Sequence, residues 1–145
     1  MVTRIINLYD GRSIKITASG ATPRRYRNIT GKEIFDDMDK VTKDYLEIMN
    51  PDDSLEESEE TIGTEFDSQD QTIIEDVLFV MSGGIIRNPD GKEVYFADTD
   101  EMLEAIETRD VFASIADIIM LWMENLGTLE EAETSGEENQ KKTAE

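Results

Sequence analysis

Hydrophobic and polar residues alternate near the start of the chain, which is the pattern of a strand with one buried face. Val2–Leu8 and Ser13–Thr17 are predicted to be strands, with Ile14 and Ile16 on the apolar face of the second. Asp10-Gly11 lies between them, and glycine accepts the positive φ of a tight turn. The sequence therefore opens with a predicted β-hairpin.

Apolar residues then recur at intervals of three and four, the period of an amphipathic helix. This pattern predicts helices over residues 34–49, 73–81, 98–106 and Asp110–Leu126. Gly83-Gly84 and Gly127 follow two of these segments and are expected to end them, because glycine adopts the left-handed conformation common after a helix. A second hairpin is predicted around the Asn88–Gly91 turn.

Three pairs of residues are spaced like helix starts. Thr22 precedes Pro23 and is expected to cap a helix in which Pro23 takes the first position. Thr30 with Glu33, and Ser68 with Gln71, have the spacing of a capping box. Asp98 and Glu101 are expected to open the short helix over 98–106.

Two acidic stretches separate and follow the periodic segments. Residues 52–70 and 128–145 contain few bulky apolar residues and are predicted to be a mobile loop and a disordered tail. The predicted fold class is α+β, mainly α. It consists of an N-terminal hairpin and about four to five helices in one domain over residues 1–127.

The charge of the chain is strongly negative and unevenly distributed. Acidic residues outnumber basic ones 34 to 14, a formal charge of −20, yet residues 1–50 hold nine basic against seven acidic residues. Nucleic acid and anionic membranes are unfavourable ligands for such a chain, since each phosphate contact requires lysine or arginine. No apolar run reaches the ~20 residues of a membrane span. We therefore expect a cytoplasmic protein.

The composition also restricts the chemistry. The 145 residues include no cysteine and no histidine, so thiolate nucleophiles, Ser-His-Asp triads and the commonest transition-metal ligands are excluded. Glycine-rich phosphate loops are absent from the sequence. We expect no enzymatic activity, no cofactor, no metal and no small-molecule substrate.

Two features could serve in protein binding. The arginines around Tyr26 could bind a carboxylate-bearing partner, because guanidinium groups pair bidentately with carboxylates. They could equally pair with acids of the chain itself. Trp122, the single tryptophan, could be an interface anchor or could pack in the core beside Ile115 and Ile119.

Several stretches together resemble one family. Ile14–Arg27 ends in Thr-Pro-Arg-Arg-Tyr-Arg and is followed by Gly31–Met38, which contains Glu-Ile-Phe. Ile118–Leu126 contains Leu-Trp-Met-Glu-Asn, with Thr128 beyond. These segments resemble the tail assembly chaperones of long-tailed phages and prophages of Gram-positive bacteria. The resemblance covers residues 14–49 and 73–128.

This resemblance implies a protein that binds the tape measure protein, keeps it soluble, helps to recruit the major tail protein and is absent from the mature virion. Self-association is left open. The partner-binding residues are expected on the least acidic third and the apolar helices: Arg24, Arg25, Tyr26, Arg27, Phe35, Ile115, Ile119 and Trp122.

Two other functions compete with this interpretation. An acidic mimic of nucleic acid could inhibit a DNA-binding protein, but it needs ordered carboxylates, and the densest acids lie in the two stretches predicted to be mobile. A small enzyme using carboxylates and a metal is disfavoured by the missing histidine and cysteine.

Overall fold

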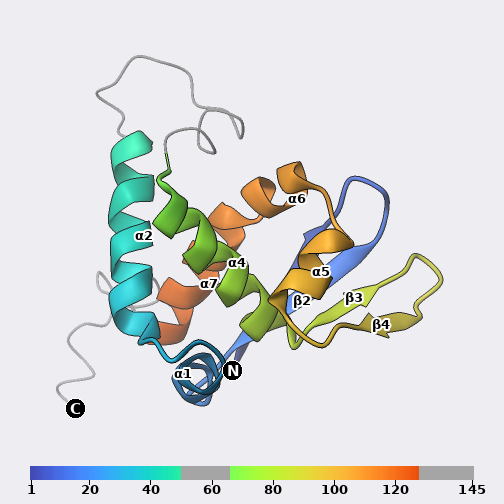
Figure 1. The fold of residues 1–145 in the computed structure, drawn as a ribbon, viewed down its shortest axis with the longest axis horizontal. Helices are drawn as coiled ribbons and strands as arrows, with labels where there is room; N and C mark the ends of the chain where they lie inside the picture. The colour runs from blue at the N-terminus through green and yellow to red at the C-terminus, as the bar shows by residue number, and fades with distance from the viewer. Residues whose placement is uncertain (50–65, 128–145) are drawn as a thin grey trace, which may run out of the picture.

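The structure is a computed structural model that describes residues 1–49 and 66–127 (Figure 1). Most of the predicted 52–70 loop, and the whole 128–145 tail, lie outside these residues. The described part combines an antiparallel sheet with helices and confirms the predicted α+β, mainly α fold. Its helices are α1 (Thr22–Thr30), α2 (Ile34–Ile48), α4 (Ser68–Ser82), α5 (Thr99–Glu104), α6 (Thr108–Ala113) and α7 (Ile115–Leu126).

Both predicted hairpins form, and they join into one sheet of order β1-β2-β3-β4. In the first, β1 (Val2–Asn7) pairs with β2 (Ser13–Ala18), and Gly11 takes a φ of 97° in the turn. In the second, β3 (Ile85–Arg87) pairs with β4 (Glu93–Tyr95). The hairpins meet where Ser13 lies opposite Arg87. Local patterns had not predicted this pairing.

The sheet buries one face and leaves the other open. Ile14 and Ile16 are 1% and 0% exposed, as their alternation predicted, whereas Ile5 on the other face is 52% exposed. Helix α7 packs against β1 and β2, and α4 packs against β2. The buried face therefore forms one wall of the core, and these two helices form the other.

Helix α4 lies at the centre of the molecule, where it contacts α1, α2, α5 and α7 as well as β2 (Figure 1). Nine of its 15 residues are buried, including the run from Val77 to Ser82. Gly83 ends it with a φ of 68°, and Gly127 ends α7 with a φ of 84°, as predicted. A helix surrounded by neighbours needs apolar residues on most sides.

A helix begins at Thr22, as predicted, but the capping roles predicted for Thr22 and Thr30 are wrong. Thr22 is the first residue of α1 and not its cap, and its hydroxyl accepts the Ser19 N–H. Thr30 is the last residue of α1, where its hydroxyl donates to the Tyr26 carbonyl and accepts the Lys32 N–H. Both hydroxyls have local backbone partners that compete with a capping role.

The Ser68–Gln71 capping box is also wrong, because the box lies one residue earlier. The Asp67 carboxylate accepts the Asp70 N–H at 2.8 Å, and the Asp70 carboxylate accepts the Asp67 N–H. Carboxylates at a helix N-terminus gain from the helix dipole as well as from the hydrogen bond. Residues 66–70 thus belong to the fold, and the predicted mobile loop was drawn too far towards the C-terminus.

The predicted helix over Asp110–Leu126 is interrupted at Ser114, which separates α6 from α7. Ser114 is 1% exposed, and its hydroxyl donates to the Val111 carbonyl at 2.6 Å. A serine that bonds back to a carbonyl of the preceding turn weakens regular helix geometry. The short helix opened by Asp98 is confirmed, because its carboxylate accepts the Glu101 N–H.

Within the described ranges, no helix has the length and apolar character needed to cross a membrane.

Candidate protein-binding surface

The arginines of α1 point away from the core. Arg24, Arg25 and Arg27 are exposed, whereas Thr22 and Tyr26 form the buried side of the helix. Arg27 donates to both carboxylate oxygens of Glu33, at 2.8 and 3.1 Å, and these hydrogen bonds lower the pKa of Glu33. Within residues 1–49 and 66–127, neither Arg24 nor Arg25 forms an ion pair. Self-pairing, one of the two interpretations of this cluster, therefore holds for Arg27.

Tyr26 belongs to the core and fastens α1 to α2. It is 0% exposed, and its hydroxyl donates to the Asp37 carboxylate at 2.7 Å. Burial, followed by the bond to Asp37, raises the pKa of Tyr26 well above its usual range. A partner on the surface of the folded protein cannot touch this ring.

Replacing Tyr26 with phenylalanine is expected to lower the free energy of unfolding by about 2 kcal/mol, because a hydrogen bond to a charged group typically contributes about 1.5–3 kcal/mol. Urea denaturation followed by the fluorescence of Trp122 measures this loss. Tyr45→Phe is the control, because Tyr45 is a partly buried tyrosine of the neighbouring helix. An equal loss in both variants would contradict the assigned role of the Tyr26 hydroxyl.

Three other residues of the predicted binding set are also buried. Ile115, Ile119 and Trp122 are at most 3% exposed and line the inner side of α7. Phe35 is different, because it is 51% exposed and meets Trp122 edge-on, with ring centroids 5.4 Å apart. Of the two interpretations of Trp122, packing in the core is therefore the one that holds, and Trp122 is not a surface anchor. Phe35 covers it from outside.

Exposed apolar side chains lie on one side of α2 near its two ends, Phe35 in the first turn and Leu46 with the cap residue Met49 at the last. Asp39 and Thr42 lie between them on that side. Leu46 is 58% and Met49 is 38% exposed, and their spacing from Phe35 places all three on one side of the helix. We call Phe35, Leu46 and Met49 the α2 stripe. Met38 and Val41, on the adjacent side, are fully buried.

The apolar period of residues 34–49 predicted a single face and did not separate the α2 stripe from the buried side of this helix. The positions on the helix contain the signal. At about 100° per residue, Phe35 and Leu46 lie about 60–140° of rotation away from Met38 and Val41. A single stripe of that width rarely fits wholly into a core.

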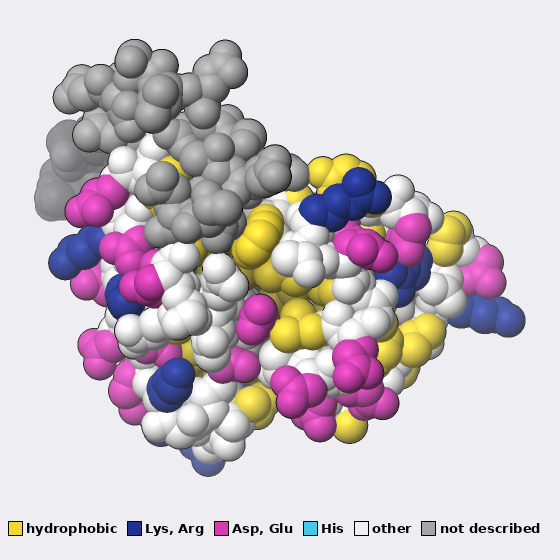
Figure 2. Space-filling model, turned by 45° about the horizontal axis from the view of Figure 1, so that its top comes forward, with side chains coloured by type: hydrophobic (Ala, Val, Ile, Leu, Met, Phe, Trp, Pro, Cys, Tyr) yellow, Lys and Arg dark blue, Asp and Glu magenta, His cyan; other side chains and the backbone are white. Residues whose placement is uncertain are grey.

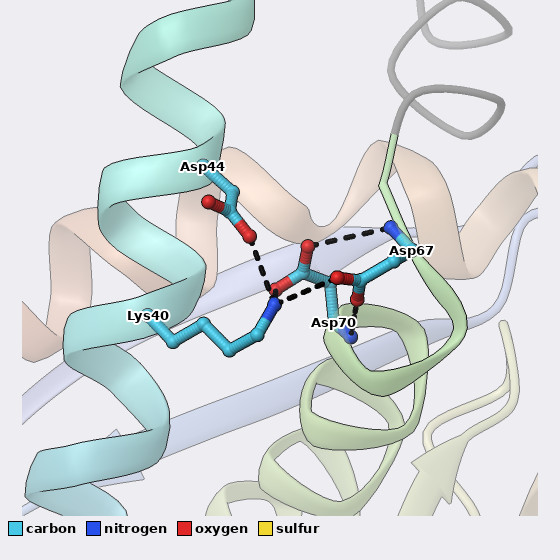
Figure 3. Close-up of polar contacts among 4 residues, drawn as sticks. All are labelled: Lys40, Asp44, Asp67 and Asp70. Carbon is cyan, nitrogen blue, oxygen red and sulfur yellow. Dashed lines mark hydrogen bonds and ion pairs between the residues drawn. The ribbon is translucent and has the colours of Figure 1, made fainter.

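A charged cluster joins α2 to the first turn of α4 (Figure 3). The Nζ atom of Lys40 lies 2.9 Å from a carboxylate oxygen of each of Asp44, Asp67 and Asp70. Asp70 is 1% exposed, whereas Asp67 lies at the surface. One ammonium group therefore holds three carboxylates from two helices.

Burial and competing charge set the protonation of this cluster. Burial, and next the neighbouring Asp44, raise the pKa of Asp70 to about 6. Hydrogen bonding with Asp70 and Lys40 lowers the pKa of Asp44. Burial opposes the charge of Lys40, but its bonds to the three aspartates raise its pKa overall. The cluster thus has more negative than positive charge and takes up a proton near pH 6.

The three carboxylates are close enough to surround a metal ion. Hard divalent cations such as Ca²⁺ prefer this kind of oxygen ligand. The ammonium group of Lys40, however, already lies at the point where the carboxylates converge, so a cation would have to displace it. The arrangement acts as a fastener between α2 and α4. The sequence contained only its local part, the Lys40–Asp44 spacing of four residues.

One of the hollows on the described surface, of about 90 Å³, lies between α4 and the α5–α6 corner. Its lining is mixed: Leu103, Ile106, Val111 and Phe112 together with Gln71, Glu75 and Thr108. Figure 2 shows hydrophobic side chains in the middle of this face and acidic ones near its edges. Pockets for small molecules usually measure 300–1,000 Å³.

Another hollow, of about 320 Å³, is open and charged. It lies between the end of α1 and the start of α5, where Lys32 faces Asp76, Asp98 and Asp100. Burial raises the pKa of Asp76, while hydrogen bonding with Thr99 lowers it. The carboxylates here face a lysine, so this hollow presents mixed charge.

Comparison with known proteins gives no relative for this arrangement. No protein-family model, no curated protein and no solved structure matches the chain.

Proposed function

We propose that this protein is a phage tail assembly chaperone that binds the tape measure protein, keeps it soluble and helps to recruit the major tail protein. The motifs of residues 14–38 and 118–128 motivate the choice of family. In this proposal the protein acts in the host cytoplasm, catalyses no reaction and leaves before the virion is complete.

The α2 stripe is the observation that carries the proposal. Phe35 at one end of α2, and Leu46 with Met49 about three turns further on, expose apolar surface on one side of the helix in a chain whose formal charge is −20. An amphipathic helix of a partner can place its own apolar positions against these side chains, as in helix-in-groove recognition. The surrounding charge keeps the complex soluble. A long helical protein awaiting assembly presents apolar helix faces of this kind.

The buried residues of the predicted set take a supporting role in this proposal. Trp122 contacts Phe35 edge-on, while Ile115 and Ile119 belong to the same buried core as Trp122. Of the eight residues, Phe35 and the three arginines are exposed, and the proposal expects direct contact through Phe35.

Co-expression with the tape measure protein tests the proposal. The expected result is a higher soluble yield of the long protein and its capture with a tagged copy of this chain. The double variant Phe35→Ser/Leu46→Ser is expected to weaken capture about 30-fold or more, because truncating central apolar anchors costs ~2 kcal/mol or more.

The control is Tyr95→Ser/Ile29→Ser, which removes one aromatic and one aliphatic side chain of similar exposure elsewhere. Thermal unfolding of both double variants first establishes that each is folded. Equal losses of capture would remove the α2 stripe from the proposal. Unchanged solubility of the tape measure protein would remove the chaperone function itself, and co-purification of a DNA-binding protein would support the mimic instead.

A further inference from the structure

The outward side of α1 is a compact basic surface on an acidic protein. Arg24, Arg25 and Arg27 project from it, and the helix contains no acidic residue of its own. We call these three residues the α1 arginine face. Glu33 pairs with Arg27, which leaves Arg24 and Arg25 unpaired within the described part of the chain. Two exposed guanidinium groups on consecutive residues of one helix attract carboxylates.

The end of α7 lies close to this surface. The contact between Phe35 and Trp122 places the last turns of α7 beside the start of α2, which only three residues separate from α1. Gly127 follows Trp122 by little more than one helical turn. Figure 1 shows α7 ending near the lower end of α2, where α1 also lies. Gly127, the last described residue of this helix end, therefore lies at the same end of the molecule as α1.

The residues that follow carry the complementary charge. Residues 128–138 include five glutamates, namely Glu130, Glu131, Glu133, Glu137 and Glu138, and no basic residue occurs before Lys141. An extended chain covers up to about 3.5 Å per residue. The five glutamates can therefore reach all of α1, which is about 13 Å long.

We propose that the acidic segment 128–138 docks on the α1 arginine face of its own chain. A separate acidic partner would have to approach a protein of charge −20, whereas the attached segment meets the arginines at a high effective concentration. The segment covers Arg24 and Arg25 and leaves the α2 stripe open. This docking is independent of the proposed function, because it concerns two parts of one chain.

A spin label on the acidic segment tests the docking. The chain contains no cysteine, so Ser135→Cys gives one labelling site, between Glu133 and Glu137. In the full-length protein at low salt, the nitroxide is expected to broaden the amide signals of residues 24–28. The signals are expected to return at about 1 M salt, where the Debye length falls to about 3 Å.

Charge variants show whether the arginines are responsible. Arg24→Gln/Arg25→Gln is expected to abolish the broadening. Lys43→Gln/Lys92→Gln removes the same number of positive charges from two exposed lysines elsewhere. This variant is expected to retain the broadening. Broadening that persists in the arginine variant or at high salt would overturn the proposal, as would its absence from α1.

Docking within one chain is distinguished from docking between two chains by mixing two samples. One copy carries the nitroxide and no ¹⁵N, and the other carries ¹⁵N and no nitroxide. Broadening of residues 24–28 in the mixed sample would place the segment on a second copy and overturn the proposal. The proposal is supported if the signals are unaffected in the mixed sample but broadened when the nitroxide and ¹⁵N are on the same chain.

Discussion

Replacing Lys40 with methionine is expected to lower the free energy of unfolding by about 3 kcal/mol at pH 7. The substitution keeps the length of the side chain but leaves three aspartates without their ammonium partner. Asp70 is 1% exposed, and removing the partner of a buried charge typically costs about 3–5 kcal/mol. The lower end applies here, because Asp44 and Asp67 retain access to water.

The loss is expected to depend on pH in a defined direction. In the native protein the pKa of Asp70 is about 6, above its ordinary value of 3.8. Its contribution to stability is therefore fully present below pH 3.8 and is lost as the pH rises through about 6. Without Lys40 the folded protein favours protonated Asp70 still more. The difference between the variant and the native protein should consequently be larger at pH 7 than at pH 5.

Lys43→Met is the matched control, because Lys43 is a lysine of the same helix with an aspartate four residues away. Its pair with Asp39 is 3.4 Å long, and both side chains are about 70% exposed. Such pairs contribute about 0.5 kcal/mol or less. Urea denaturation at pH 5 and pH 7, followed by Trp122 fluorescence, compares the two variants. The role of the Lys40 cluster as a fastener between α2 and α4 would be refuted by equal losses of unfolding free energy in the two variants. A loss in Lys40→Met that is larger at pH 5 than at pH 7 would also refute it.

Replacing Gly84 with alanine is expected to cost about 3 kcal/mol. Gly84 has a φ of 73°, and an added Cβ would lie 2.8 Å from the carbonyl oxygen of Phe96 and 2.9 Å from the ring of Phe79. The left-handed conformation alone costs about 1–2 kcal/mol for an L-residue, and the clash adds about 1–3 kcal/mol. The backbone cannot shift freely, because the Gly84 carbonyl accepts the Phe96 N–H at 2.7 Å.

Gly31→Ala isolates the two contributions. Gly31 has a φ of 76°, close to that of Gly84, but no atom lies within 4 Å of its added Cβ. Only the conformational cost of about 1–2 kcal/mol is expected there. Thermal unfolding of the two variants measures the difference, and equal melting temperatures would show that the contact with Phe96 and Phe79 is relieved without cost.

The sequence predicted those parts of the fold that depend on neighbouring residues. The turn at Gly11 and the helix ends at Gly83 and Gly127 require a positive φ, which glycine supplies wherever the rest of the chain lies. Helix α2 followed from its apolar period. Helix starts were harder, because hydroxyls such as those of Thr22 and Thr30 can bond to several nearby backbone groups.

Features that join distant residues could not be predicted in this way. Ser13 and Arg87 pair across the sheet, and Lys40 meets Asp70 between two helices. Both contacts depend on how the elements pack, which no local period encodes. For the same reason the binding set mixed exposed and buried residues. Phe35 and Ile115 are both apolar and helical, and only packing distinguishes them.

Part of the cover of the N-terminal hairpin comes from the far end of the chain, and this imposes a delay during synthesis. Helix α7 packs on β1 and β2, but about 100 residues separate it from the hairpin. At about 5–20 residues per second, the ribosome needs on the order of 5–20 seconds to make them. Throughout that interval Ile14 and Ile16 lack their final cover. The nascent chain thus passes through a period in which its own sheet is an aggregation risk.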